Sequence, residues 1–124
     1  MEKGKYYMAK CHEHNYSPEL QNCIETAYQH CIDCASLGCD ADDTEKVKYP
    51  IMMLGKIQSG KTRAFTGLMS LAFDNHFDLV LILSKNSKAL IQQTYKRMRR
   101  EFEPFIKEYE IEVFDIMRVI DEYE

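Results

Sequence analysis

Eight consecutive residues, Gly55 to Thr62, could bind a phosphate group because they fit the pattern G-x-x-x-x-G-K-[ST]. In such a loop, glycines let backbone N–H groups turn inward around an anion, and the loop opens onto a helix N-terminus. The lysine, Lys61, would reach the β/γ-phosphates of a nucleotide, and the hydroxyl of Thr62 would bind the bridging Mg²⁺. We expect these two residues to be the catalytic ones. The predicted ATP-binding set is Gly55, Lys56, Ile57, Gln58, Ser59, Gly60, Lys61 and Thr62.

The residues on either side supply the elements that must position this loop. Residues 50–54 form a short apolar run that begins with proline, which predicts a buried strand. After the loop, apolar residues recur at helical spacing, and the continuous apolar run 77–83 predicts a second buried strand. Strand, helix and strand would form a right-handed βαβ unit. The alternative is a glycine-containing turn that binds no ligand. The apolar positions of the predicted helix are Phe65, Leu68, Met69, Ala72 and Phe73.

A further helix and a third strand are predicted beyond this unit. Asn86 or Ser87 suits the N-cap of a helix that Pro104 interrupts, and residues 111–116 alternate as an edge strand would. The expected inner face of this helix comprises Leu90, Ile91, Thr94, Met98 and Phe102. Asp121-Glu122 follows an apolar pair and could imitate a Mg²⁺-binding strand end, although a plain acidic terminus is favoured.

The N-terminal part of the chain predicts one long helix. Ser17 is a good N-cap, Pro18 fits the first helical position, and apolar residues share one face as far as Leu37. Residues 1–16 show no clear periodicity and are interpreted as an arm. We therefore expect two parts: residues 1–48 with an arm, a helix and an acidic connector, and residues 49–124 with the nucleotide-binding domain.

The cysteines and histidines of the first part allow two interpretations. The odd number of cysteines, five, favours reduced thiols. Cysteines on the apolar face of the helix favour packing as small hydrophobic side chains, whereas the local density of thiols and imidazoles also allows structural zinc. The residues concerned are Cys11, His12, His14, Cys23, His30, Cys31, Cys34 and Cys39.

Composition restricts the class of protein. A hydrophobic content of 45% and a charged content of 29% are ordinary for a globular protein. No leader-like or bilayer-length apolar run is visible, so we expect a cytoplasmic protein that does not contact a membrane. The net charge of −4 argues against a protein that binds nucleic acid with its entire surface. Residues 79–100, however, contain basic side chains and no acidic one.

From Gly55 to Arg97 the chain resembles superfamily 2 helicases and related ATPase domains of prokaryotic defence and restriction systems. The resemblance rests on Gln58-Ser59 within the loop and on Leu90-x-x-Gln93 in the later helix. It implies an α/β fold: part of a first RecA-like P-loop NTPase domain, a three-layer structure with about three parallel strands, preceded by an N-terminal helix. It also implies the cofactors ATP and Mg²⁺.

The same resemblance implies contact with a nucleic-acid backbone, DNA in preference to RNA. By position, the contacting residues would be Ser87, Lys88, Gln93 and Arg97. No convincing acidic Mg²⁺/water motif is present, so hydrolysis would need further RecA-like domains or a partner protein. The leading hypothesis is the ATP-binding N-terminal part of a helicase- or translocase-like ATPase, and the resemblance includes ATPases of prokaryotic defence systems. Alternatives are a truncated interaction module without catalysis and a small P-loop kinase.

Overall fold

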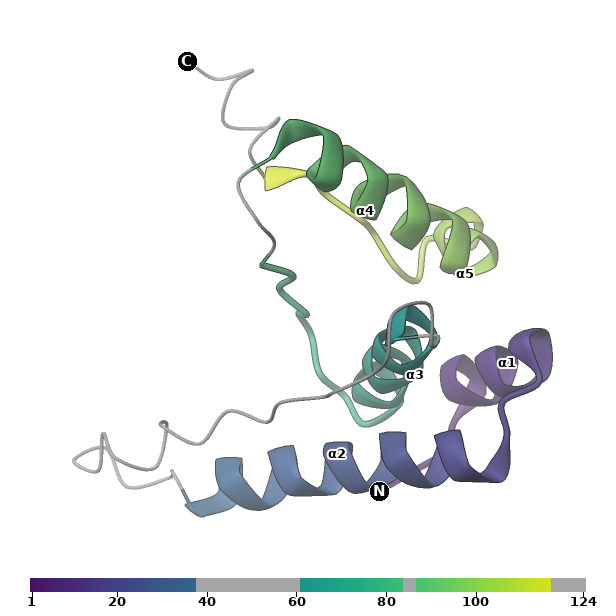
Figure 1. Ribbon diagram of the computed structural model, residues 1–124, viewed down its shortest axis with the longest axis vertical. Helices are drawn as coiled ribbons and strands as arrows, with labels where there is room; N and C mark the ends of the chain where they lie inside the picture. The colour runs from purple at the N-terminus through teal and green to yellow at the C-terminus, as the bar shows by residue number, and fades with distance from the viewer. Residues whose placement is uncertain (38–60, 84–86, 117–124) are drawn as a thin grey trace. The chain divides into compact units, whose positions relative to one another are not determined.

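The computed structural model describes residues 1–37, 61–83 and 87–116 (Figure 1). The secondary structure of these residues is helical. The chain divides into two compact units, Met1–Val80 and Leu81–Glu124. The helices are α1 (Lys5–His14), α2 (Pro18–Leu37), α3 (Lys61–Asp74), α4 (Lys88–Glu101) and α5 (Glu103–Lys107).

The predicted α/β fold with a parallel sheet is wrong for the described residues. The two predicted strands that fall within them, residues 77–83 and 111–116, are not strands. An apolar run becomes a strand only where a partner supplies ladder hydrogen bonds and packing, and a single sequence does not contain that information. The RecA-like sheet is therefore not the scaffold of this part of the chain. The predicted first strand at 50–54 and the predicted domain boundary at 48/49 lie outside the described residues.

The capping signals gave correct helix starts. The Ser17 hydroxyl accepts a hydrogen bond from Leu20 N at 3.2 Å, directly before α2. Helix α2 spans Pro18–Leu37, as predicted. Ser87 caps α4 in the same way, although its bond from Leu90 N is long at 3.5 Å. In both cases a short side chain satisfies an N–H group that has no partner within the helix.

The first sixteen residues are not an irregular arm, because ten of them form α1. Gly4 is the N-cap residue of this helix, and it has no side chain that could accept a hydrogen bond from the first turn. The acceptor comes instead from another part of the chain. Asp74, the last residue of α3, accepts hydrogen bonds from Gly4 N at 3.0 Å, Tyr6 N at 3.0 Å and Tyr7 N at 2.9 Å.

The core of the first unit lies where α3 packs against both α1 and α2 (Figure 1). Aromatic and aliphatic side chains from all three helices are buried together there. Partly buried Leu20, Leu68 and Ala72 lie against this cluster. Part of the apolar face predicted for α2, including Leu20 and Ile24, thus packs against α3. The buried cluster is Tyr7, Tyr16, Ile24, Tyr28, Ala64 and Leu71.

The buried face of α3 is only partly the predicted one. Leu68 and Ala72 contact the core as expected, but Phe65 is exposed. The buried positions are Leu71 and four small or hydroxyl-bearing residues, Ala64, Thr66, Gly67 and Ser70. Small residues allow α1 and α2 to approach the α3 backbone closely. The face of α3 that carries them is therefore buried, in place of the face with the largest apolar side chains.

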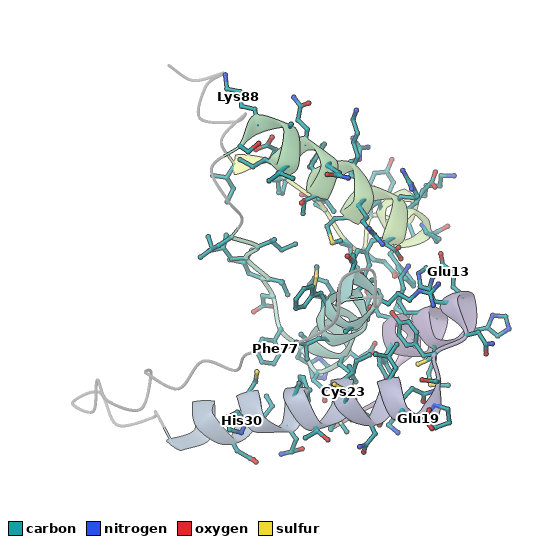
Figure 2. The ribbon with its side chains drawn as sticks, in the orientation of Figure 1. Glu13, Glu19, Cys23, His30, Phe77 and Lys88 are labelled. Carbon is teal, nitrogen blue, oxygen red and sulfur yellow. The ribbon has the colours of Figure 1, made fainter. Side chains whose placement is uncertain are left out.

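The predicted helix end at residues 74–76 is confirmed. His76 has φ 69°, and its N–H group donates to Phe73 O at 3.3 Å. Phe77 N donates to Ala72 O at 3.0 Å, which completes a Schellman motif. The Phe77 ring then lies edge-on to Tyr28 of α2, with ring centroids 6.3 Å apart (Figure 2). This contact fixes the chain as it leaves α3.

In the second unit, α4 and α5 pack together. Pro104 lies in the first turn of α5, so the predicted interruption of the helix is confirmed. Met98 and Phe102 are buried and Ile91 is half-buried, as the expected inner face requires, whereas Leu90 is exposed. Residues 111–116 follow this helical pair without forming a strand.

Candidate phosphate-binding site

The structure describes the helical end of the predicted phosphate loop. Helix α3 is described from Lys61 to Asp74, and Lys61 and Thr62 are its first described residues. The other predicted ATP-binding residues, Gly55, Lys56, Ile57, Gln58, Ser59 and Gly60, lie outside the described residues. A phosphate loop requires its lysine and hydroxyl residue to open a helix, because the free N–H groups of the first turn point toward the anion. The helix predicted after the loop is present, and its junction with the loop lies outside the described residues.

Two carbonyl groups in the first turn of α3 accept hydrogen bonds from side chains. The Thr66 hydroxyl donates to Thr62 O at 2.8 Å, one helical turn back along α3. The Tyr16 hydroxyl donates to Arg63 O at 2.7 Å, from the segment between α1 and α2. The second bond ties the turn that contains Thr62 to a buried residue 47 positions earlier in the chain.

Gly67 allows this close approach. A Cβ atom at Gly67 would lie 2.7 Å from Ile24 Cδ1 and 3.1 Å from Tyr16 Cε2. Both distances are shorter than ordinary van der Waals contacts, so a larger residue would push α3 away from α2 and from the Tyr16 ring. The glycine thus keeps the Tyr16 hydroxyl within reach of the first turn of α3.

The residues predicted to contact nucleic acid do not share one face of α4. Ser87 is the N-cap, and Lys88 is the first residue of the helix (Figure 2). Gln93 and Arg97 are four residues apart, so both lie on one side, and both are exposed. Lys88 precedes Arg97 by nine positions, which places it about 180° away around the helix. The exposed basic residues Lys88, Lys96, Arg97, Arg99 and Arg100 spread over the entire polar side of α4.

A second group of reactive side chains lies in the core. Tyr7 is fully buried, and burial, followed by the neighbouring Cys11 thiol, raises the pKa of its hydroxyl well above the ordinary value. Burial also raises the pKa of Cys11. Cys23 and Cys31 are exposed, so the prediction that these two thiols pack in the core is wrong. The side chain of Cys34 and the whole of Cys39 lie outside the described residues.

Sequence reasoning missed Tyr16 and Asp74 as structural partners of the site helix. Their bonds join residues 47 and 70 positions apart, and such pairings leave no periodic signal. The one visible signal is that Asp74-Asn75 combines two good capping residues at a helix end, where an acidic group is unfavourable for its own helix. Asn75 also donates to Glu2 O at 2.9 Å and accepts from Glu2 N at 2.8 Å.

Comparisons of the chain with known protein families, with curated proteins and with solved structures found no match. Among the described helices, none is long and apolar enough to cross a membrane.

Proposed function

We propose that this chain binds ATP with Mg²⁺ through the loop Gly55–Thr62. One observation carries the proposal: the helix that the loop pattern demands is present after the loop, and Lys61 and Thr62 are its first described residues. The first turn of α3 is also tied to the core through Arg63 O, so its N–H groups have a fixed direction. An anchored helix N-terminus attracts a phosphate because its N–H groups and its dipole both favour negative charge.

In this proposal Lys61 neutralises phosphate charge and the Thr62 hydroxyl binds Mg²⁺. The groups that would activate water are expected in further domains or in a partner protein. The ATP-binding part would then belong to a helicase- or translocase-like ATPase of the kind found in prokaryotic defence systems. The described element that follows the loop, α3, packs against the helices α1 and α2, and the proposal does not depend on a sheet.

Titration calorimetry with Mg²⁺–ATP tests the proposal. We expect saturable binding by the wild-type chain and a loss of at least about tenfold in affinity for Lys61→Ala, because a charge-assisted phosphate contact contributes about 1.5–3 kcal/mol. The matched control is Lys107→Ala, which removes one exposed lysine from α5 and should leave the affinity unchanged. Equal ATP affinity in folded Lys61→Ala and wild-type protein would refute the proposal.

The nucleic-acid part of the proposal is supported by the exposed basic side of α4. The sequence of α4 contains five basic residues and no acidic one before Glu101, its last residue. Phosphate contacts of this kind make affinity depend on salt, and each lost contact reduces the slope of log K against log salt by about 1. Single-stranded DNA binding should therefore show such a slope, and Arg97→Ala should reduce it. A binding constant that does not change with salt would contradict nucleic-acid contact by α4.

A second candidate is an interaction module without catalysis, and the exposed apolar run after α3 favours it. Leu79 is 77% exposed and Leu83 is 85% exposed. A run of neighbouring residues with large, exposed apolar side chains is typical of a protein-binding segment. Capture of one defined partner by the wild-type chain, lost on Leu79→Ser and unaffected by ATP, would favour this function over nucleotide binding.

A further inference from the structure

Tyr16 connects the core to the first turn of α3. Its side chain is 5% exposed, and its hydroxyl donates to Arg63 O at 2.7 Å. Arg63 directly follows Thr62, the predicted Mg²⁺ ligand. In a helix the carbonyl of Arg63 is also the acceptor for the N–H group four residues later, that of Gly67. The tyrosine hydroxyl therefore occupies the second lone pair of a carbonyl that belongs to the helical ladder.

The position of the Tyr16 ring is itself fixed from two sides. Its Cε2 atom lies 3.1 Å from the point where a Cβ of Gly67 would be, so the ring lies against the α3 backbone. The His14 ring stacks with the Tyr16 ring, with centroids 5.9 Å apart and planes inclined by 15°. The Tyr16 backbone is also held, because its N–H group donates to Cys11 O at the end of α1. A ring held in this way can act as a rigid support for the first turn.

We propose that Tyr16 is a positioning residue for nucleotide binding, which acts by holding the first turn of α3 in its helical form. This inference rests on the proposed function. A helix frays at its ends unless side chains or tertiary contacts hold them. If the first turn frays in the free protein, part of the binding energy is used to order it, and the affinity falls. The Tyr16 hydroxyl reduces that loss before the nucleotide arrives.

The variant Tyr16→Phe removes the hydroxyl and keeps the ring. We expect Mg²⁺–ATP to bind about three- to tenfold more weakly, the loss that corresponds to one hydrogen bond. Tyr28→Phe is the matched control, because Tyr28 is a buried tyrosine of the same core whose ring meets Phe77 at the other end of α3. Both variants are compared at a temperature where circular dichroism shows them fully folded.

Hydrogen exchange separates positioning from a general loss of stability. In the nucleotide-free protein, Tyr16→Phe should speed exchange of the Thr66 and Gly67 amides, which bond to the first-turn carbonyls, by about the same factor as the affinity loss. The Leu71 amide, farther along α3, should not change. A purely structural role would instead speed exchange along the whole of α3, as global destabilisation does.

The outcomes distinguish this inference from the function on which it rests. Wild-type protein that does not bind ATP overturns both. Wild-type protein that binds ATP, together with a Tyr16→Phe variant of equal affinity and unchanged exchange at the first turn, overturns the role of Tyr16 alone. Gly67→Ala provides a second test, since its methyl group would press against the Tyr16 ring and should weaken ATP binding at least as much as Tyr16→Phe does.

Discussion

Removal of the Asp74 carboxylate should weaken the attachment of α1 to α3. In Asp74→Ala the three N–H groups at the start of α1, those of Gly4, Tyr6 and Tyr7, lose their acceptor together. Water can reach this half-buried site only in part, so the loss is not fully replaced by solvation. The substitution therefore removes the cap of one helix and a hydrogen-bonded link between two helices that also pack through the core.

The magnitude follows from these three bonds. Replacing a single N-cap side chain by alanine costs about 0.5–2 kcal/mol, and hydrogen bonds to a charged acceptor contribute about 1.5–3 kcal/mol each. One carboxylate shared by three donors does not contribute three independent terms, and its removal also relieves an unfavourable charge at the end of α3, worth about 0.3–1 kcal/mol. We expect a net loss of about 2 kcal/mol in the free energy of unfolding. For a unit of this size the melting temperature should fall by about 10 °C.

Thermal and urea unfolding, followed by circular dichroism, measure this loss. Asp74→Asn should lose about half as much, because one oxygen remains as an acceptor. Asp78→Ala is the control, since Asp78 is an exposed carboxylate four residues later and should change stability by less than about 0.5 kcal/mol. If Asp74→Ala unfolds with the same midpoint as Asp78→Ala, the carboxylate cap does not hold α1 in place.

Three further outcomes are expected. Burial raises the pKa of Tyr7, so above pH 10 this tyrosine ionises in the unfolded chain before it does in the folded one, and stability falls. Between pH 9 and 11 the free energy of unfolding in urea should fall by up to about 1.4 kcal/mol less per pH unit for Tyr7→Phe than for the wild type. An equal fall for both proteins would contradict this. Thiol labelling mapped by mass spectrometry should modify exposed Cys23 and Cys31 before Cys11, whose pKa burial raises; the reverse order would be inconsistent with the packing of α1. His76→Gly should raise the free energy of unfolding by about 0.5–1 kcal/mol, measured as a higher urea midpoint, because glycine adopts positive φ without strain. An unchanged or lower midpoint would show that His76 is not strained.

The helices could be predicted where local chemistry alone specifies them. Ser17 and Ser87 sit at the starts of α2 and α4 because a hydroxyl satisfies N–H groups within three residues, and such signals are complete in the local sequence. The turn at residues 74–76 was recognised for the same reason. Helix α1 was missed because its cap, Asp74, is contributed from 70 positions away.

The sheet was predicted wrongly because apolar runs do not reveal their partners. The run after α3 has the composition of a buried strand, yet Leu79 and Leu83 are among the most exposed large apolar residues. A strand needs a neighbouring strand, and the loop pattern supplied that neighbour only by resemblance to a family. The helix after the loop was predicted correctly, because apolar residues at helical spacing follow the glycine-lysine-threonine order. The contact of Tyr16 with that helix depends on tertiary packing and could not be predicted.

The binding of ATP at Gly55–Thr62 is tested most directly by the backbone amide resonances of the isotope-labelled chain during a Mg²⁺–ATP titration. The account predicts that the largest shifts occur at residues 55–62 and that they decline along α3, with saturation at one nucleotide per chain. It also predicts that Lys61→Ala abolishes these shifts while the resonances of α1 and α2 stay in place. An absence of shifts in the wild-type chain, or largest shifts away from residues 55–62, would contradict it.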